Sequence, residues 1–298
     1  MSRYVDPLID FSFKRLFGVE PNKDLLIDFL NAVFEGNRVI EDVVYTKNEY
    51  VGDTETIGSV VFDLICTDKG GSIFLIEIQR TNQYNIKNRM LYYASKLITD
   101  QARRGKRSAW NYKLQEVFII VLLDGFTLNP RNTHQYLYRV GLCNQETGAH
   151  FYDRLGFVYI ELRNFNKESD DLKTNLDKWL YVLKNLAGMN TLPIFLRKHV
   201  FIKLFKLAEY SKMNKEDRAM YDVNLKRQWD AYNVKETARL EGLEEGREKG
   251  REEGREEEAL KNIREKLSIA QKLKIMGLPI PTIIDVTGLS AEVLKDLH

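Results

Sequence analysis

The chain has 298 residues, of which 44% are hydrophobic and 30% are charged, so it can bury a sizeable core in one large domain with one or two smaller ones. Its formal net charge of +2 at pH 7 by itself predicts neither a nucleic-acid-binding nor a membrane-surface protein. Two cysteines, Cys66 and Cys143, are too few for a disulfide framework or a structural zinc site. The N-terminus lacks a signal-peptide pattern and no apolar run is long enough to span a bilayer, so we expect a cytoplasmic protein without membrane segments.

The first half of the chain alternates between helix-like and strand-like patterns. Apolar residues at helical spacing predict two helices within residues 7–35, separated by the segment 18–22 that contains Pro21. Further on, runs of β-branched and aromatic residues predict strands around one more helix. In chain order these are strands at 41–50, 60–67 and 73–79, a helix at 84–104, and strands at 117–123, 135–142 and 157–162. The alternation predicts an α/β core within residues 1–165.

The composition changes after this core. Residues 166–235 carry helical apolar stripes, residues 236–258 contain a repeat of glycine, glutamate and arginine, and residues 259–298 are typical of a small helical tail. Each of the four glycines in the repeat costs a helix roughly 0.8–1 kcal/mol relative to alanine. Each Glu–Arg pair at helical spacing returns only roughly 0.2–0.5 kcal/mol. This balance favours a solvated linker, and the alternative is a helix whose glycine stripe contacts another helix.

Two acids and an amide interrupt apolar strands. Asp63 lies in the run Val60–Cys66, and runs of this kind are usually buried on both faces, where an ionised carboxylate is costly without a cation or hydrogen-bond donors. Glu77 and Gln79 share one face of the next strand, because side chains alternate along a strand. A hairpin brings Asp63 opposite residues 77–79, and the length of the turn or a β-bulge decides whether Asp63 shares the face of Glu77. Oxygen ligands of this kind suit Mg²⁺ or Mn²⁺, whereas an ion-paired structural acid is the alternative for each carboxylate taken alone.

A basic segment follows these acids. Residues 80–113 contain nine lysines and arginines and the single acid Asp100. The aromatic residues interleaved with them are Tyr84, Tyr92, Tyr93, Trp110 and Tyr112. Such a segment can contact phosphates, although a solvated helix face would carry the same charges. The acids of the repeat compensate the charge, so a polyanion-binding first half and an acidic second half explain the near-neutral total.

Four segments, taken in order, carry a family resemblance. They are Asp10–Gly18 (DFSFKRLFG), Leu30–Ala32 (LNA), Asp63 followed after 13 residues by Glu77–Gln79 (EIQ), and Arg89–Lys96 (RMLYYASK). Their order and spacing are similar to those of PD-(D/E)XK nuclease family transposases, which are also described as recombination-promoting nucleases. The glycine–glutamate repeat and the tail also resemble the C-terminal regions attached to this family.

The resemblance implies a restriction-endonuclease-like core, a mixed sheet flanked by helices, followed by an all-α C-terminal region. It also implies metal-dependent cleavage of DNA in recombination, mobile elements or defence. Asp63 and Glu77 would bind Mg²⁺, or Mn²⁺, together with the carbonyl group of Ile78. Gln79 stands where the superfamily usually has lysine, and glutamine can orient water or phosphate by hydrogen bonds but supplies no positive charge.

The resemblance assigns further residues to the edge of the site. Lys14 or Arg89 would meet the transition-state charge that Gln79 cannot, and Asp10 would accompany Lys14, with an ordinary helix-surface ion pair as the alternative. The DNA contacts implied are Arg80, Lys87, Arg89, Tyr93 and Lys96. For Arg89 and Tyr93 a purely structural pair is the alternative.

A competing function is a catalytically silent DNA-binding or interaction protein that keeps the nuclease fold. The complete set of Asp63, Glu77 and Gln79 favours the nuclease. The tail shows no recognition helix rich in arginine, asparagine or glutamine, so protein–protein contact is the expected role of residues 259–298. A homodimer through the C-terminal helices would suit double-strand cleavage, since each active site cuts one strand.

Overall fold

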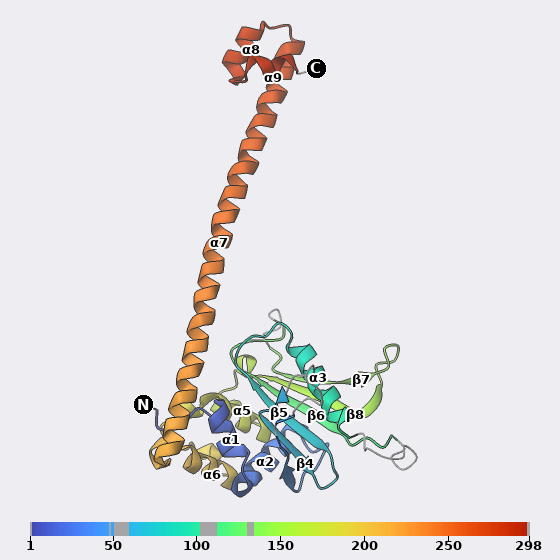
Figure 1. Ribbon diagram of the computed structural model, residues 1–298, viewed down its shortest axis with the longest axis vertical. Coiled ribbons are helices and arrows are strands. Elements are labelled where there is room, and N and C mark those ends of the chain that lie inside the picture. The colour runs from blue at the N-terminus through green and yellow to red at the C-terminus, as the bar shows by residue number, and fades with distance from the viewer. Residues whose placement is uncertain (1, 48, 51–59, 102–111, 130–133, 297–298) are drawn as a thin grey trace. The chain divides into compact units, whose positions relative to one another are not determined.

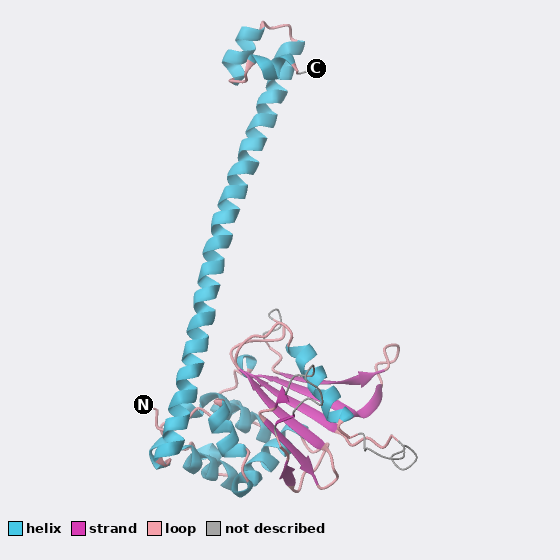
Figure 2. Cartoon of the chain, in the orientation of Figure 1, coloured by secondary structure: helices cyan, strands magenta, loops and turns pink. Residues whose placement is uncertain are grey.

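The computed structural model describes residues 2–47, 49–50, 60–101, 112–129 and 134–296 (Figure 1). The chain divides into two compact units, Met1–Gln228 and Trp229–His298. The first unit combines helices with strands and the second is helical (Figure 2). None of the helices within the described ranges combines the length and the apolar character that crossing a bilayer requires.

The first unit begins with two helices that pack on the sheet. Helix α1 spans Asp10–Phe17 and α2 spans Lys23–Phe34, joined by a 3₁₀ turn at Glu20–Asn22 that contains Pro21. Proline is tolerated at the start of a helical turn because it lacks only an N–H that would be unpaired there. The break between the two helices therefore lies within residues 18–22, as predicted.

A mixed six-stranded sheet forms the centre of the first unit. Its strands, in spatial order, are β1 (Val43–Tyr45), β4 (Leu64–Asp68), β5 (Ile73–Gln79), β6 (Val117–Leu123), β8 (His150–Glu161) and β7 (Leu137–Cys143). The β5–β6 and β6–β8 pairs are parallel, and the other three pairs are antiparallel. Strands β2 (Glu49–Tyr50) and β3 (Val60–Val61) form a separate antiparallel pair. The predicted α/β class with a mixed sheet is confirmed.

Helices cover both faces of this sheet (Figure 1). On one face lie α1, α2, α5 (Asn175–Asn185) and α6 (His199–Ala208), and on the other lies α3 (Ile86–Thr99). The alternation along β5 shows how one strand serves both layers: Phe74 and Ile76 join the core under the four helices, and Leu75 joins the core under α3. Short 3₁₀ helices lie at Leu162–Asn164, Ser169–Asp171, Leu186–Gly188, Ile194–Leu196 and Tyr210–Lys212.

The helices after residue 165 belong to the same core as the sheet. Trp179 of α5 is fully buried, and its ring contacts Phe17 of α1 and Phe29 of α2 at centroid distances of 5.7 and 5.8 Å. Phe201 of α6 packs on the same tryptophan at 4.9 Å. Helices α5 and α6 therefore supply part of the helical layer on one face of the sheet, and the first compact unit extends to Gln228.

Two predicted strands differ from the structure. The strand expected at 60–67 is interrupted at Phe62 and Asp63, and β4 begins only at Leu64. The strand expected from residue 157 begins at His150, because its first half pairs with β7 in an exposed hairpin that has no apolar pattern to reveal it. The helix expected at 84–104 is α3, and the part of that prediction beyond residue 101 lies outside the described residues.

The glycine–glutamate repeat is helical. Helix α7 runs from Lys215 to Ile275 and includes the whole of 236–258, so the expectation of a linker is replaced by a helix. Space is open around the glycines: a Cβ atom added at any of the four would meet no described atom within 4 Å. In the second unit α8 (Ile280–Thr287) and α9 (Ala291–Lys295) pack on the end of α7. Ser290 caps α9 by accepting a hydrogen bond from the Val293 N–H, as the sequence predicts.

Candidate active site

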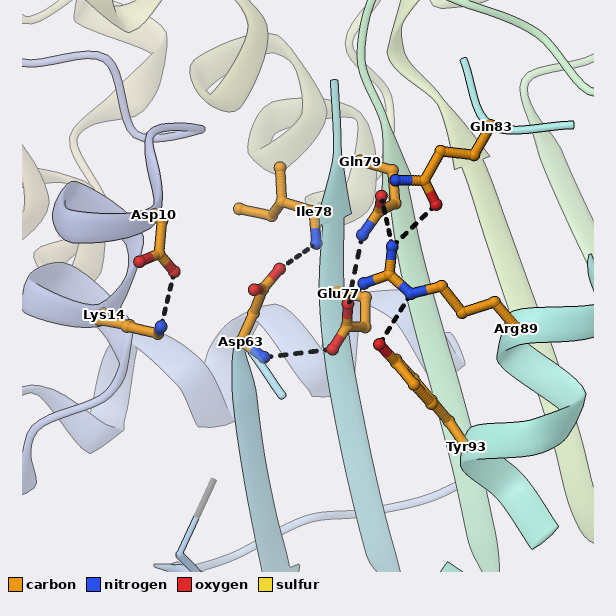
Figure 3. A network of polar contacts seen from close by, with 9 residues as sticks. All are labelled: Asp10, Lys14, Asp63, Glu77, Ile78, Gln79, Gln83, Arg89 and Tyr93. Carbon is orange, nitrogen blue, oxygen red and sulfur yellow. Dashed lines mark hydrogen bonds and ion pairs between the residues drawn. The ribbon is translucent and has the colours of Figure 1, made fainter. Parts of the chain in front are cut away.

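The break before β4 places the first acid. The β4–β5 register pairs Leu64 with Ile76, so the next pair would be Asp63 with Glu77, but the strand ends there. Instead, the Asp63 N–H donates to Glu77 Oε1 at 3.1 Å, and Asp63 Oδ2 accepts from the Ile78 N–H at 2.7 Å. The Asp63 carboxylate thus occupies the edge of β5 that a continuing strand would have paired, and it meets Glu77 there (Figure 3).

The main chain of Ile78 faces this same edge. Ile73 N–H donates to Glu116 O, and Gln79 O accepts from Asp124 N–H, so the odd-numbered residues of β5 turn their peptide groups toward β6. Successive residues of a strand turn their peptide groups to opposite sides. The carbonyl group of Ile78 therefore lies on the edge where its N–H meets Asp63, which is the side that the predicted metal-ligand role needs.

The second acid contacts an amide and an arginine. Glu77 is fully buried, and its Oε2 accepts from Gln79 Nε2 at 3.2 Å and lies 3.3 Å from Arg89 Nη2. Arg89, on α3, also donates from Nη1 to Gln79 Oε1 at 3.2 Å. The guanidinium group is therefore in contact with Gln79, which stands where the superfamily usually has lysine (Figure 3).

Aromatic packing holds Arg89 in place. Tyr93 is 7% exposed, and its hydroxyl accepts from Arg89 Nε at 2.7 Å. The Tyr93 ring meets Phe62 edge-on at a centroid distance of 4.9 Å. Because Phe62 precedes Asp63, the same packing anchors the strand break. Sequence reasoning did not assign Phe62 a role, since it reads as one more apolar residue of a strand.

Burial makes the two acids costly to ionise. Burial raises the pKa of Glu77 to about 8, and the neighbouring Asp63 charge adds to the effect. Burial also raises the pKa of Asp63, opposed by the hydrogen bond from the Ile78 N–H. Arg89 is the one cation bonded to Glu77 among the described residues. A second cation at the acids would lower this cost.

The donor set fits a hard divalent cation. Two carboxylates and a carbonyl group on one edge are oxygen ligands of the kind that Mg²⁺ and Mn²⁺ prefer, with water completing the shell. Among the residues that the structure describes, no group of three or more His, Cys, Asp or Glu side chains could hold a metal ion. Asp63 and Glu77 are thus the side-chain ligands that this site offers.

Asp10 and Lys14 lie on α1, on the other side of Asp63 from Glu77 (Figure 3). They pair with each other at 2.7 Å, and their side chains are 52% and 36% exposed. After burial and the Ile78 hydrogen bond, Asp10 raises and Lys14 lowers the pKa of Asp63. The pair therefore acts on the site through its charges and keeps a surface ion-pair geometry. Its catalytic role stays a prediction.

Two lysines expected to contact DNA lie on α3, Lys87 exposed and Lys96 partly buried. The Lys96 ammonium group lies 5.7 Å from the centre of the Tyr92 ring. Tyr93 accepts a hydrogen bond from Arg89, which is the structural pair given as the alternative, and its contact with DNA stays a prediction. Much of the basic segment (Arg103, Arg104, Lys106, Arg107 and Trp110) lies outside the described residues.

Arg80, which the sequence predicts to contact a DNA phosphate, is ion-paired with two carboxylates of the protein. Its guanidinium group pairs with Asp6 Oδ2 at 2.6 Å and with Asp124 Oδ2 at 2.9 Å. This clamp joins the N-terminal segment to the ends of β5 and β6. Burial already raises the pKa of Asp124, and Arg80 opposes that rise, so the arginine has a clear structural function.

Arg80→Ala and Lys87→Ala should therefore behave differently. We expect Arg80→Ala to lower the free energy of unfolding by about 1–3 kcal/mol, because it leaves two partly buried acids without their partner. Lys87→Ala should leave stability unchanged and weaken DNA binding with a smaller salt dependence. Urea unfolding and DNA-binding titrations measure both, and equal stability of the two variants would contradict the clamp.

The model of the PD-(D/E)XK nuclease family transposases matches residues 7–238 of the chain. A search of curated proteins and a search of solved structures each returned no match. The matched segment contains the sheet, both flanking helix layers, the strand break and the first part of α7. With more than half of its length matched, the chain belongs to the PD-(D/E)XK nuclease family transposases, and its function is nuclease- or transposase-related.

Proposed function

We propose that the chain is a divalent-metal-dependent DNA endonuclease that hydrolyses phosphodiester bonds in recombination, mobile elements or defence. The observation that carries this proposal is the pair of buried acids, Asp63 and Glu77, brought together by a strand break. A purely structural acid pair would gain nothing from this arrangement, because burial raises the pKa of both carboxyls. In a cation-binding centre the bound ion offsets the cost of ionising the two buried carboxyls, because it makes both negative charges favourable.

In the proposed site Asp63, Glu77 and the Ile78 carbonyl group would hold Mg²⁺, with Mn²⁺ as the alternative. When bound, the ion would activate a water molecule and neutralise charge that develops on the phosphate. Gln79 holds its amide between Glu77 and Arg89 and would orient water or a phosphate oxygen by hydrogen bonding. Its bonds to Glu77 and Arg89 fix the orientation of the Gln79 amide, whereas an unbonded glutamine would rotate freely.

Arg89 would supply the positive charge that Gln79 does not. Its side chain is 30% exposed, so one part contacts Glu77 while another part remains open to solvent and substrate. Arginine stays charged at any working pH. Four of the five N–H groups of Arg89 are donated to protein oxygens, which leaves one on Nη2 for a phosphate oxygen. Lys14 is the second candidate, at the opposite side of Asp63.

One observation favours the competing function. Arg89 already neutralises part of the Glu77 charge without a metal ion, as would suit a silent protein that keeps the fold to bind DNA. Cleavage of a covalently closed DNA circle separates the two functions, because only the endonuclease would nick it. The circle has no ends, so a contaminating exonuclease would not cut it. The endonuclease predicts nicking by the full chain with Mg²⁺ or Mn²⁺ and none in EDTA. DNA binding without metal-dependent nicking would support the silent protein.

A further inference from the structure

A fully exposed tyrosine lies beside the site. Tyr84 is in the turn between β5 and α3, five residues after Gln79, and its side chain is 101% exposed. Among the other large apolar side chains of the described residues, none exceeds the 81% of Ile275. An aromatic ring left wholly in water contributes nothing to the core, so the fold gives no reason for an aromatic residue here.

The turn that carries Tyr84 is fixed on both sides. Gln83 Oε1 accepts from Arg89 Nη1 at 2.8 Å, and Gln83 O accepts from the Ile86 N–H at 3.2 Å (Figure 3). After the tyrosine, Asn85 O accepts from the Arg89 N–H at 2.9 Å, in the first turn of α3. The arginine that contacts Glu77 and Gln79 thus also holds Gln83, so the exposed Tyr84 belongs to a turn that is bonded to the site.

The charges around Tyr84 suit a polyanion. From Arg80 to Thr99 the sequence has no aspartate or glutamate, and it contains Lys87, Arg89 and Lys96. The remaining turn residues are uncharged and polar: Thr81, Asn82, Gln83 and Asn85. A phosphate backbone approaching the acids past this turn would meet the cations and amides of this segment, and the nearby carboxylates of Asp6 and Asp124 are paired with Arg80.

We propose that Tyr84 stacks on a nucleobase next to the cleaved phosphate and makes the protein select DNA in which a base can leave its neighbours. Stacking on an aromatic side chain is tolerant of sequence, because every base has a π-face. Unstacking a base costs least in single strands and at mismatches. The inference rests on the proposed function for the position of the scissile bond, and it adds the preferred class of substrate, unpaired DNA.

Binding and stacking can be measured without cleavage, with the full chain in EDTA. The probes are a single-stranded oligonucleotide with a central 2-aminopurine and the same oligonucleotide paired in a duplex. Wild type should bind the single strand more tightly than the duplex and quench the 2-aminopurine fluorescence of the single strand. Tyr84→Ala should weaken single-strand binding about tenfold to a hundredfold and abolish quenching, whereas Tyr84→Phe should keep both. Tyr232→Ala removes a tyrosine that is 67% exposed on α7 and should match wild type.

Each outcome decides between the two proposals. Wild-type binding and quenching retained in Tyr84→Ala, or absent from wild type, would overturn the stacking role. A parallel assay with Mn²⁺ on matched and mismatched duplexes tests cleavage. Tyr84-dependent quenching without any metal-dependent cleavage would support the stacking role and reject the nuclease. Metal-dependent cleavage with the same mismatch preference in wild type and Tyr84→Ala would do the reverse.

Discussion

Glu77→Gln is expected to stabilise the metal-free protein at pH 8 while removing a ligand of the site. In the folded chain burial raises the pKa of Glu77 to about 8, from an ordinary value of 4.5. Between those values the folded state holds a proton that the unfolded state releases, so wild-type stability falls as pH rises through this window. The full cost of ionising Glu77, on the order of 5 kcal/mol, is present only above the folded pKa. Glutamine has no charge and avoids it.

Thermal unfolding in EDTA between pH 5 and pH 9 measures this effect. Wild type should lose stability over that range relative to Glu77→Gln, and the variant should unfold at a temperature higher by about 10–20 °C at the alkaline end. Saturating Mn²⁺ should raise the unfolding temperature of wild type and not that of the variant, because only a ligand that binds the folded state stabilises it. Parallel pH profiles of the two proteins would contradict the account.

Arg89→Gln should lower the cleavage rate about a hundredfold, as expected when one preorganised charged donor is lost from a reaction centre. Arg89→Lys keeps the charge but loses the forked geometry, so its rate should lie between those of Arg89→Gln and wild type. The control is Ser95→Ala, which removes an exposed hydroxyl of α3 that bonds the Tyr92 carbonyl group within the helix. That variant should cleave at nearly the wild-type rate.

A second substitution tests the idea that the charge of the lysine position is supplied from α3. Gln79→Lys places an ammonium group where the superfamily usually has lysine, next to Glu77. In the Arg89→Gln background it should recover a large part of the lost rate, and single-turnover cleavage rates measure the recovery. If Arg89→Gln cleaves as fast as wild type, the transition-state charge is met elsewhere, with Lys14 as the remaining candidate.

Much of the sheet could be predicted because its central strands are buried on both faces. The ranges 73–79 and 117–123 match β5 and β6, since β6 is a continuous apolar run and β5 is apolar except at Glu77 and Gln79. The first half of β8 could not be predicted, because its hairpin with β7 is exposed and follows no apolar period. The sequence predicts a linker where α7 is helical. That prediction counts the cost of four glycines over 241–258 and takes no account of the helical segments on either side.

The site residues could be found from the sequence where they violate a pattern. Asp63, Glu77 and Gln79 stand out as polar residues within apolar strands, and the structure brings them together. Whether Asp63 would meet Glu77 could not be decided, because the strand break at Phe62 and Asp63 determines it. The contacts of Arg89 with Glu77 and Gln79 join α3 to β5, and contacts of that kind depend on packing that no local period encodes.

The most direct test of the central claim is nicking of a closed circular plasmid with Mn²⁺ by wild type, Glu77→Gln and Glu161→Gln. Glu161 is also fully buried, but it bonds the Leu128 N–H and the Asn164 amide, away from Asp63. Circular dichroism establishes that all three proteins are folded. We predict that Glu77→Gln loses nicking about a thousandfold while Glu161→Gln nicks like wild type. Equal nicking by wild type and Glu77→Gln would contradict the assignment of the buried acid pair as the catalytic centre.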